Sequence, residues 1–263
     1  MHYSNEQDKI DRYINSFATE VFRDQADRDY IAARLACRAE LTPQFLWSAQ
    51  QAVEKYLKAI LVYNRRPAKK VGHCIATALK LAEAIQEPFT IDLSARSRKF
   101  IGHVANYGEI RYIERSYFVD GYILVDLDLT VWELRRYCQV LNVFGKALPD
   151  QEQKLLAQAL SDLRKSDVEP RYKFRVHGGL IEQVRKDSRH PARSALLWNN
   201  LAFASRKRKT VKVRDHMAGC NALLDNYPEM LDELLKFVSL PKSLEKAHRE
   251  HMAAIQKDPS SRT

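Results

Sequence analysis

The chain has 263 residues with only 8 glycines and 9 prolines, which disfavours an all-β protein with many turns and favours helices. Its formal net charge of +10 favours a polyanionic partner. No run of about 18 apolar residues occurs, so we expect no membrane segment. The four cysteines lack a C-x-x-C spacing and the first ten residues are polar. We therefore expect free thiols, no metal or other cofactor, and a cytoplasmic protein.

Apolar residues recur at spacings of three and four along most of the chain, which is the period of a helix with one buried face. In the first part this pattern predicts helices over 5–23, 27–41, 42–64, 73–85, 94–117 and 122–145. In the second part it predicts helices over 150–164, 179–188, 192–205, 214–238 and 242–256. We therefore expect an all-α protein.

Local signals mark the ends of two of these helices. Thr42 can cap the helix that starts there, and Pro43 suits its first position because proline's missing N–H is not needed. Ser94 is a cap candidate for the helix over 94–117. Glu54 and Lys58 stand four apart, in the order that gives modest surface support to a helix.

Three groups of residues carry a family resemblance. They are Gln51, Ala52, Glu54, Lys55, Lys58, Ala59 and Leu61, then His73, and then Tyr107, Arg111 and Tyr112. In this order they resemble the HEPN family (higher eukaryote and prokaryote nucleotide-binding domains) over about residues 27–145. The resemblance implies an up-and-down helical bundle that forms homodimers. The proline that often follows the Arg-Tyr pair in this family is Ile113 here.

Composition changes after Pro149, where the chain becomes more basic and no family is recognised. We expect an N-terminal helical extension over 1–26, a HEPN-like bundle over 27–148 and a smaller basic helical region over 149–263.

Catalytic members of the family share an arginine followed, after four to six residues, by a histidine. The resemblance implies a metal-independent ribonuclease in which the histidine is the general base and the arginine steadies the phosphate. Arg98 and His103 enclose four residues, and Arg96 and His103 enclose six. On a straight helix, Arg96 returns to within about 20° of the face of His103, whereas Arg98 lies about 140° away.

This motif departs from the family pattern in two places. Ser97 or Lys99 follows the arginine where Asn or Asp is usual, and Ala105 stands where Tyr is frequent. Because His103 lies beside Phe100 on an apolar face, the pattern favours a hydrogen-bonded core or interface histidine over a catalytic one. The departures favour a non-catalytic or weakly catalytic module that binds nucleic acid, RNA above all. The alternative is an endoribonuclease of the prokaryotic defence and toxin type.

The positive charge is concentrated between residues 164 and 214, which hold 15 Lys or Arg and 4 Asp or Glu, a difference of +11. Basic residues with interleaved aromatics such as Tyr172 and Phe174 are typical of single-strand binding, although a solvated helix face is the alternative. The candidate nucleic-acid contacts are Arg171, Lys173, Arg175, Arg206, Lys207, Arg208, Lys209 and Lys212. Expected partners are RNA or single-stranded nucleic acid, a second copy of the chain and an operon-encoded protein.

Overall fold

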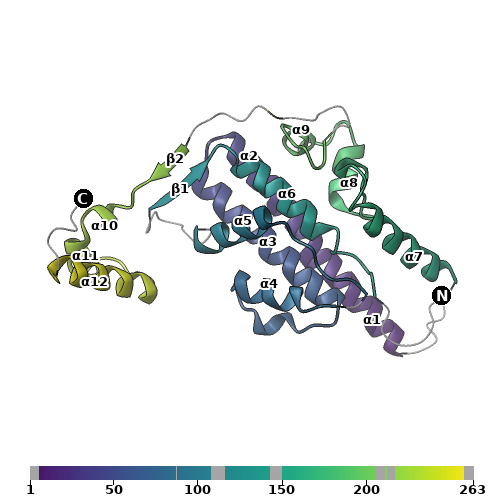
Figure 1. Ribbon diagram of the computed structural model, residues 1–263, viewed down its shortest axis with the longest axis horizontal. Helices are drawn as coiled ribbons and strands as arrows, with labels where there is room; N and C mark the ends of the chain where they lie inside the picture. Colours follow the sequence, from purple (N-terminus) through teal and green to yellow (C-terminus); the bar gives the residue numbers. More distant parts are fainter. Residues whose placement is uncertain are drawn as a thin grey trace. The chain divides into compact units, whose positions relative to one another are not determined.

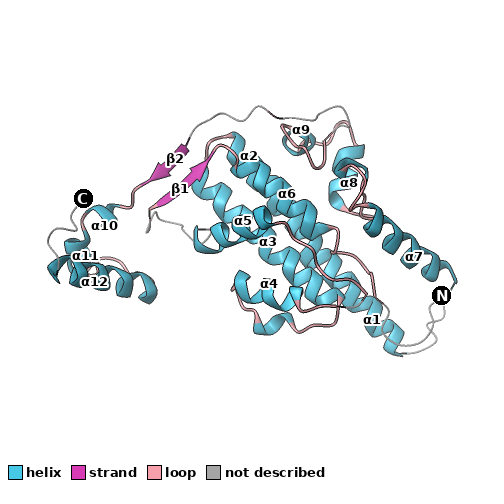
Figure 2. Ribbon diagram, viewed as in Figure 1, coloured by secondary structure: helices cyan, strands magenta, loops and turns pink. Residues whose placement is uncertain are grey.

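The computed structural model describes residues 6–86, 88–107, 116–142, 150–204, 211 and 217–257 (Figure 1). Helices dominate these residues and a single pair of short strands accompanies them, which confirms the all-α class (Figure 2). Contacts divide the chain into two compact units. The first unit comprises 1–109 with 122–214, and the second comprises 110–121 with 215–263.

The chain begins with three helical elements that follow one another without a break. They are α1 (Glu6–Phe17), a π-helical stretch (Ala18–Arg23) and α2 (Asp24–Arg38). The sequence predicted separate helices over 5–23 and 27–41. No glycine or proline lies between Glu6 and Arg38. Nothing in this stretch therefore removes a backbone donor or favours a turn, and the helical path continues.

Helix α3 (Thr42–Tyr63) is the centre of the first unit and contacts α1, α2, α4, α5 and α6. Its inward residues Phe45, Ala49, Val53 and Leu57 are almost fully buried, as the spacing predicted. The expected cap is wrong. Thr42 is already helical, and Leu41 occupies the cap position, where its carbonyl accepts the Phe45 N–H at 2.9 Å.

Three further helices complete the bundle: α4 (Ile75–Glu83), α5 (Ala95–Tyr107) and α6 (Ile123–Arg135). Ser94 caps α5 as expected, because its Oγ accepts the Ser97 N–H at 3.2 Å. The Ser94 N–H donates to Glu133 Oε2 on α6 at 2.9 Å. The start of α5 is thereby fixed against α6.

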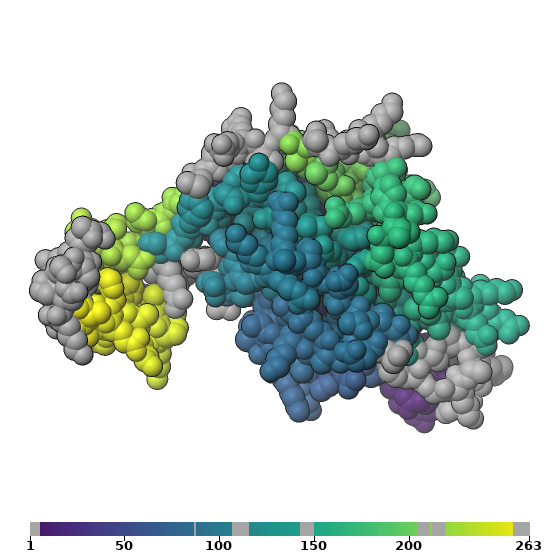
Figure 3. All heavy atoms as spheres, in the orientation of Figure 1, coloured from purple at the N-terminus to yellow at the C-terminus, as the bar shows by residue number. Residues whose placement is uncertain are grey.

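Residues 150–204 belong to the same unit as the bundle and contain α7 (Asp150–Lys165), a 3₁₀ turn (Arg171–Lys173), α8 (Leu180–Lys186) and α9 (Arg193–Leu197). In Figure 3 these green residues lie directly beside the teal residues of the bundle. Buried arginines make the attachment: Arg34 Nε donates to the Ala195 carbonyl at 3.0 Å, and Arg136 Nη1 donates to Ser166 Oγ at 3.1 Å. The boundary expected after residue 148 stays a prediction.

Helix α9 is shorter than the helix expected over 192–205. Asn199 adopts a left-handed backbone with φ of 47°, which ends the helical path after Leu197. The Asn200 side chain then accepts the N–H groups of Ala202 and Phe203, both at 2.9 Å. Side-chain capping by asparagine therefore competes successfully with helix continuation here.

The helix expected over 214–238 is wrong, because the second unit contains a strand and several short elements there. Strand β2 (Met217–Cys220) pairs antiparallel with β1 (Tyr117–Asp120), so that Tyr117 faces Cys220. Short elements follow: α10 (Leu223–Asn226), a 3₁₀ turn (Pro228–Met230), α11 (Leu231–Leu234) and α12 (Lys242–Lys257). A helix across this region would leave Pro228 without an N–H to donate, whereas β1 supplies β2 with hydrogen-bond partners from a distant part of the chain.

Among the described residues, no helix is both long enough and apolar enough to cross a membrane.

Candidate functional site

Helix α5 carries the three candidate catalytic residues, and its two arginines reach different neighbours. Arg96 Nε donates to Asp126 Oδ1 on α6, and its guanidinium lies 6.0 Å from the centroid of the Tyr122 ring. Arg98 forms an ion pair with Glu83 on α4. Both arginine side chains are nearly half exposed. Their divergence agrees with the angular separation expected for residues two apart on a helix.

His103 lies on the same face of α5 as Arg96, because the two residues are seven positions apart, close to two helical turns. It is half-buried, and the neighbouring Phe100 and Val104 are buried. Each arginine uses a carboxylate of an adjacent helix as its ion-pair partner. The catalytic assignment of Arg96, Arg98 and His103 therefore stays a prediction.

Family-motif residues from two segments meet at one end of α4. Glu54 Oε1 accepts a hydrogen bond from Lys58 Nζ at 2.6 Å and lies 3.2 Å from His73 Nδ1. The Glu54 side chain is only 4% exposed, whereas that of His73 is 81% exposed. The sequence predicted the Glu54–Lys58 pair from its spacing, but it did not pair His73 with Glu54. Of the other motif residues, Arg111 and Tyr112 lie outside the described residues.

The basic region lies partly outside the described residues, since Arg206, Lys207, Arg208, Lys209 and Lys212 are not among them. The described part contributes nine cationic side chains, which we call the basic surface. They are Arg164, Lys165, Arg171, Lys173, Arg175, Arg185, Lys186, Arg189 and Arg193. Arg185 and Arg193 are half-buried, and the others are exposed.

Two of the four acidic residues of the same segment pair with arginines of the bundle instead of with the basic surface. Glu182 accepts two hydrogen bonds from Arg135, at 2.8 and 2.7 Å, and Asp167 pairs with Arg136. Within the described part of the chain, Lys173 is the one member of the basic surface with an ion pair, to Glu169 at 3.5 Å. The positive charge of this surface is therefore mostly uncompensated by neighbouring carboxylates.

Trp132 of α6 contacts two residues of the segment that carries the basic surface, Arg171 and Phe174. Its Nε1 donates to the Arg171 carbonyl at 3.2 Å, and the Arg171 guanidinium lies 5.4 Å from the Trp132 ring centroid. The Phe174 ring meets Trp132 edge-on, with centroids 6.4 Å apart. Phe174 therefore packs against the bundle in addition to standing among the basic residues.

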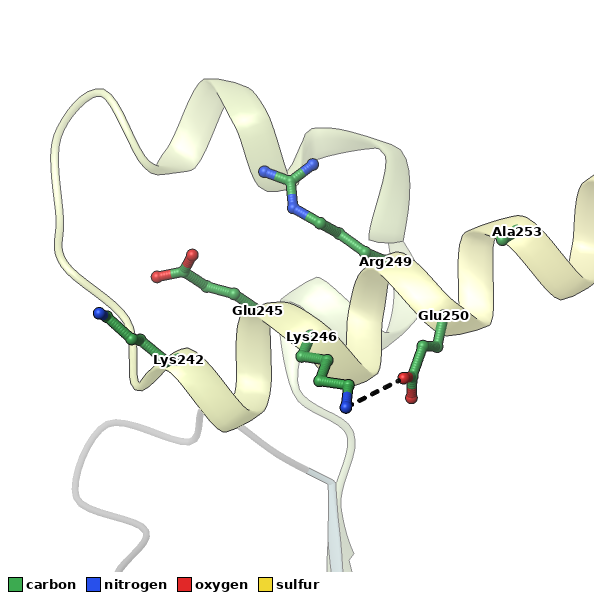
Figure 4. A pocket seen from close by; sticks show the side chains of 6 residues that line it. All are labelled: Lys242, Glu245, Lys246, Arg249, Glu250 and Ala253. Carbon is green, nitrogen blue, oxygen red and sulfur yellow. Dashed lines mark ion pairs between the residues drawn. The ribbon is translucent and has the colours of Figure 1, made fainter.

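A shallow pocket in the second unit has a different electrostatic character (Figure 4). Both cations and acids lie along its wall on α12, and Lys246 Nζ lies 3.7 Å from Glu250 Oε1. Arg249 pairs with Asp232 at 2.7 Å. Because two of its three cations have acidic partners, this pocket carries less uncompensated charge than the basic surface. Among the described residues, no cluster of three or more histidines, cysteines or acids is placed to hold a metal ion.

The fold defines a helical bundle domain organised around one long central helix and followed by a closely attached basic segment. Residues 19–130 match the model of the HEPN domain family, so this part of the chain is a HEPN domain, as the sequence motifs indicated. The match starts within the π-helical stretch and ends in α6. No curated protein and no solved structure gives a significant match to the chain.

Proposed function

We propose that this HEPN-domain protein binds RNA, or single-stranded nucleic acid more generally, as a non-catalytic or weakly catalytic helical module that acts as a dimer. The observation that carries the proposal is the division of charge between 164 and 193. Glu182 and Asp167, two of its four acids, pair with Arg135 and Arg136 of the bundle, while most of its cations are exposed to solvent. Cationic surfaces of this kind bind phosphate backbones by releasing counterions, with little sequence readout.

Fluorescence anisotropy with a labelled RNA strand tests the proposal. Arg171, Lys173 and Arg189 are changed together to Gln, and a control protein carries Gln at Arg66, Lys69 and Lys70, which are equally exposed cations of the same unit. The first variant should bind RNA more weakly at every salt concentration and show a flatter salt dependence. The control should bind like wild type. If RNA binding weakened equally in both variants, the effect would come from net charge and not from the basic surface. If wild type bound no RNA even at low salt, the proposal would be wrong.

An endoribonuclease is the second candidate function. The match to the HEPN family favours it, together with a capped helix that places Arg96 and His103 on one face. In this mechanism His103 takes the proton of a ribose 2′-OH, and that oxygen attacks the adjacent phosphorus. The P–O5′ bond breaks, and the leaving 5′ oxygen takes a proton from water. The products are a 2′,3′-cyclic phosphate and a 5′-OH end, and no metal takes part. An arginine compensates the charge that builds on the phosphate.

A further inference from the structure

Two guanidinium groups of the basic surface converge on one backbone oxygen. Arg185 Nη2, from α8, donates to the Tyr172 carbonyl at 3.2 Å. Arg175 Nη1 donates to the same oxygen and also to the Phe174 carbonyl at 2.8 Å. Two cations from separate elements are thereby held close together by a shared acceptor.

Arg185 has a donor that the protein leaves unused. Its Nη1 is buried and meets no hydrogen-bond acceptor among the described residues. Buried polar groups are nearly always hydrogen-bonded, and an unmatched donor on a charged group is costly. Neither Arg175 nor Arg185 has an ion-pair partner in the described part of the chain. The pair therefore combines two positive charges with an unsatisfied donor.

Electrostatics at this pair favour an added negative charge. Burial, and then the neighbouring Arg175, lower the pKa of Arg185 to about 10, and burial lowers the pKa of Arg175. Glu182 opposes these shifts, but its oxygens already accept hydrogen bonds from Arg135 and from the Val176 N–H. An anion near the two guanidinium groups would relieve the repulsion between them.

The elements that carry the pair are rigidly placed. Ile181 and Val184 of α8 are fully buried. A Cβ at Gly179, at the start of α8, would lie 2.2 Å from Glu182 Oε2 and 2.3 Å from Arg135 Nη2, so the backbone approaches this ion pair as closely as glycine allows. The position of Arg185 is thus fixed by the core, and a ligand there would meet a preorganised partner.

We propose that Arg175 and Arg185 form a seat for one phosphoryl group, with both guanidinium groups donating to its oxygens. Arginine suits this role because its planar fork matches phosphate in a bidentate manner. Arg185 Nη1 is buried, so a side chain must shift to admit the anion. Arg175 is the side chain able to move, because it is exposed and its hydrogen bonds go only to backbone carbonyls.

If the proposed function holds, the phosphoryl group belongs to a nucleic-acid backbone. This assignment of the source, unlike the seat itself, rests on the proposed function. A free phosphate or a nucleotide presents the same chemistry. The seat lies at residues 171–185, beyond the segment that matches the HEPN family.

Calorimetry with the full-length protein in a chloride buffer provides the test, with inorganic phosphate and a short single-stranded RNA as separate probes. Arg185→Gln should weaken phosphate binding about tenfold or more, because it removes charge-assisted hydrogen bonds. Arg66→Gln is the matched control, since this arginine is exposed in the same unit but lies outside the basic surface. It should change phosphate affinity less than about twofold, as expected for an exposed cation without a bound partner.

Two further variants test whether the shape of the guanidinium group matters beyond its charge, and whether weaker binding is due to loss of folding. Arg185→Lys keeps the charge but loses the fork, so it should bind phosphate nearly as weakly as Arg185→Gln. Arg175→Gln alters an exposed side chain and should also weaken phosphate binding, even if Arg185→Gln fails to fold. Circular dichroism identifies any variant that has lost its helices. Wild-type affinity in Arg175→Gln would overturn the seat.

The two probes distinguish the seat from the proposed function. If Arg185→Gln weakens both phosphate and RNA binding, the seat is supported and takes a nucleic-acid phosphate. Phosphate binding that depends on Arg185, in a protein that binds no RNA, would support the seat with a free phosphate or nucleotide as source and overturn the proposed function. RNA binding without any phosphate binding, weakened equally by Arg185→Gln and by Arg189→Gln at another cation of the basic surface, would overturn the seat alone.

Discussion

Arg135 and Glu182, 47 residues apart in the sequence, form a bidentate ion pair in which both arginine Nη atoms donate to the two carboxylate oxygens at 2.8 and 2.7 Å. The same guanidinium donates to Asp27 Oδ1 at 2.8 Å and to Asp27 Oδ2 at 2.9 Å. One buried cation thus links α2, α6 and α8, and it joins the basic segment to the HEPN domain.

Removing Arg135 should destabilise the protein strongly. Arg135→Met leaves the buried Asp27 and the half-buried Glu182 without their shared cation, and breaking a buried pair in this way costs about 3–5 kcal/mol. Urea unfolding followed by circular dichroism measures the loss. Lys173→Gln is the control, because its exposed pair with Glu169 contributes at most about 1 kcal/mol. A loss of similar size in the two variants would contradict the central role of Arg135.

The Glu182 carboxylate should make stability depend on pH. Burial by itself raises the pKa of Glu182, but Arg135 and the Val176 N–H outweigh it, so the pKa is lowered below 4.5. A carboxylate with a lowered pKa in the folded state stabilises the protein above its unfolded pKa, and this contribution is lost as pH falls through the folded pKa. The advantage of wild type over Glu182→Gln should therefore be full above about pH 5 and shrink steadily at lower pH. Free energies of unfolding of both proteins at a series of pH values test this expectation. A difference between them that stays constant with pH would contradict it.

RNA affinity should fall steeply with salt. If about five phosphates of a single strand are neutralised, log K should decrease with log salt at a slope near −3.5. Alanine at Arg206, Lys207, Arg208 and Lys209 should flatten that slope if these residues contact phosphates. An unchanged slope in this quadruple variant would leave RNA binding, if present, to other cations of the chain.

Nuclease activity, if present, should persist in EDTA, leave a 2′,3′-cyclic phosphate and spare DNA, which lacks the attacking 2′-OH. His103→Ala should reduce cleavage about 10²- to 10⁴-fold while RNA binding survives, since a general base contributes about that much. Arg96→Ala should reduce cleavage more than Arg98→Ala, because Arg96 shares the face of His103. Product analysis by mass spectrometry identifies the cyclic end. RNA binding without cleavage, identical in wild type and His103→Ala, would leave the non-catalytic module.

The protein should sediment as a two-fold dimer at micromolar concentration, since the HEPN resemblance implies association through the bundle helices. Analytical ultracentrifugation over a concentration series measures this directly. A clear monomer would contradict both the dimer and any active site that two copies share.

The sequence by itself determined the helices whose signals are local. The spacing of Phe45, Val53 and Leu57 predicted α3, and Ser94 correctly marked the start of α5, because periodicity and capping act within one or two turns. The motif around Glu54 likewise indicated the HEPN domain that the family match confirmed. These features need no knowledge of distant residues.

Only the tertiary structure decided which surfaces meet. Ile10, Tyr13 and Phe17 have the spacing of a buried helix face, yet they remain 44, 71 and 42% exposed, because periodicity gives a helix its face but not its partner. Strand β2 formed where a helix was expected, since its hydrogen bonds come from β1 about 100 residues earlier. The charge excess of the basic segment was visible in the sequence. The choice of ion-pair partners was not visible there: Glu182 bonds to Arg135, 47 residues earlier in the chain. Arg175 and Arg185 converge on the Tyr172 carbonyl without an ion-pair partner among the described residues.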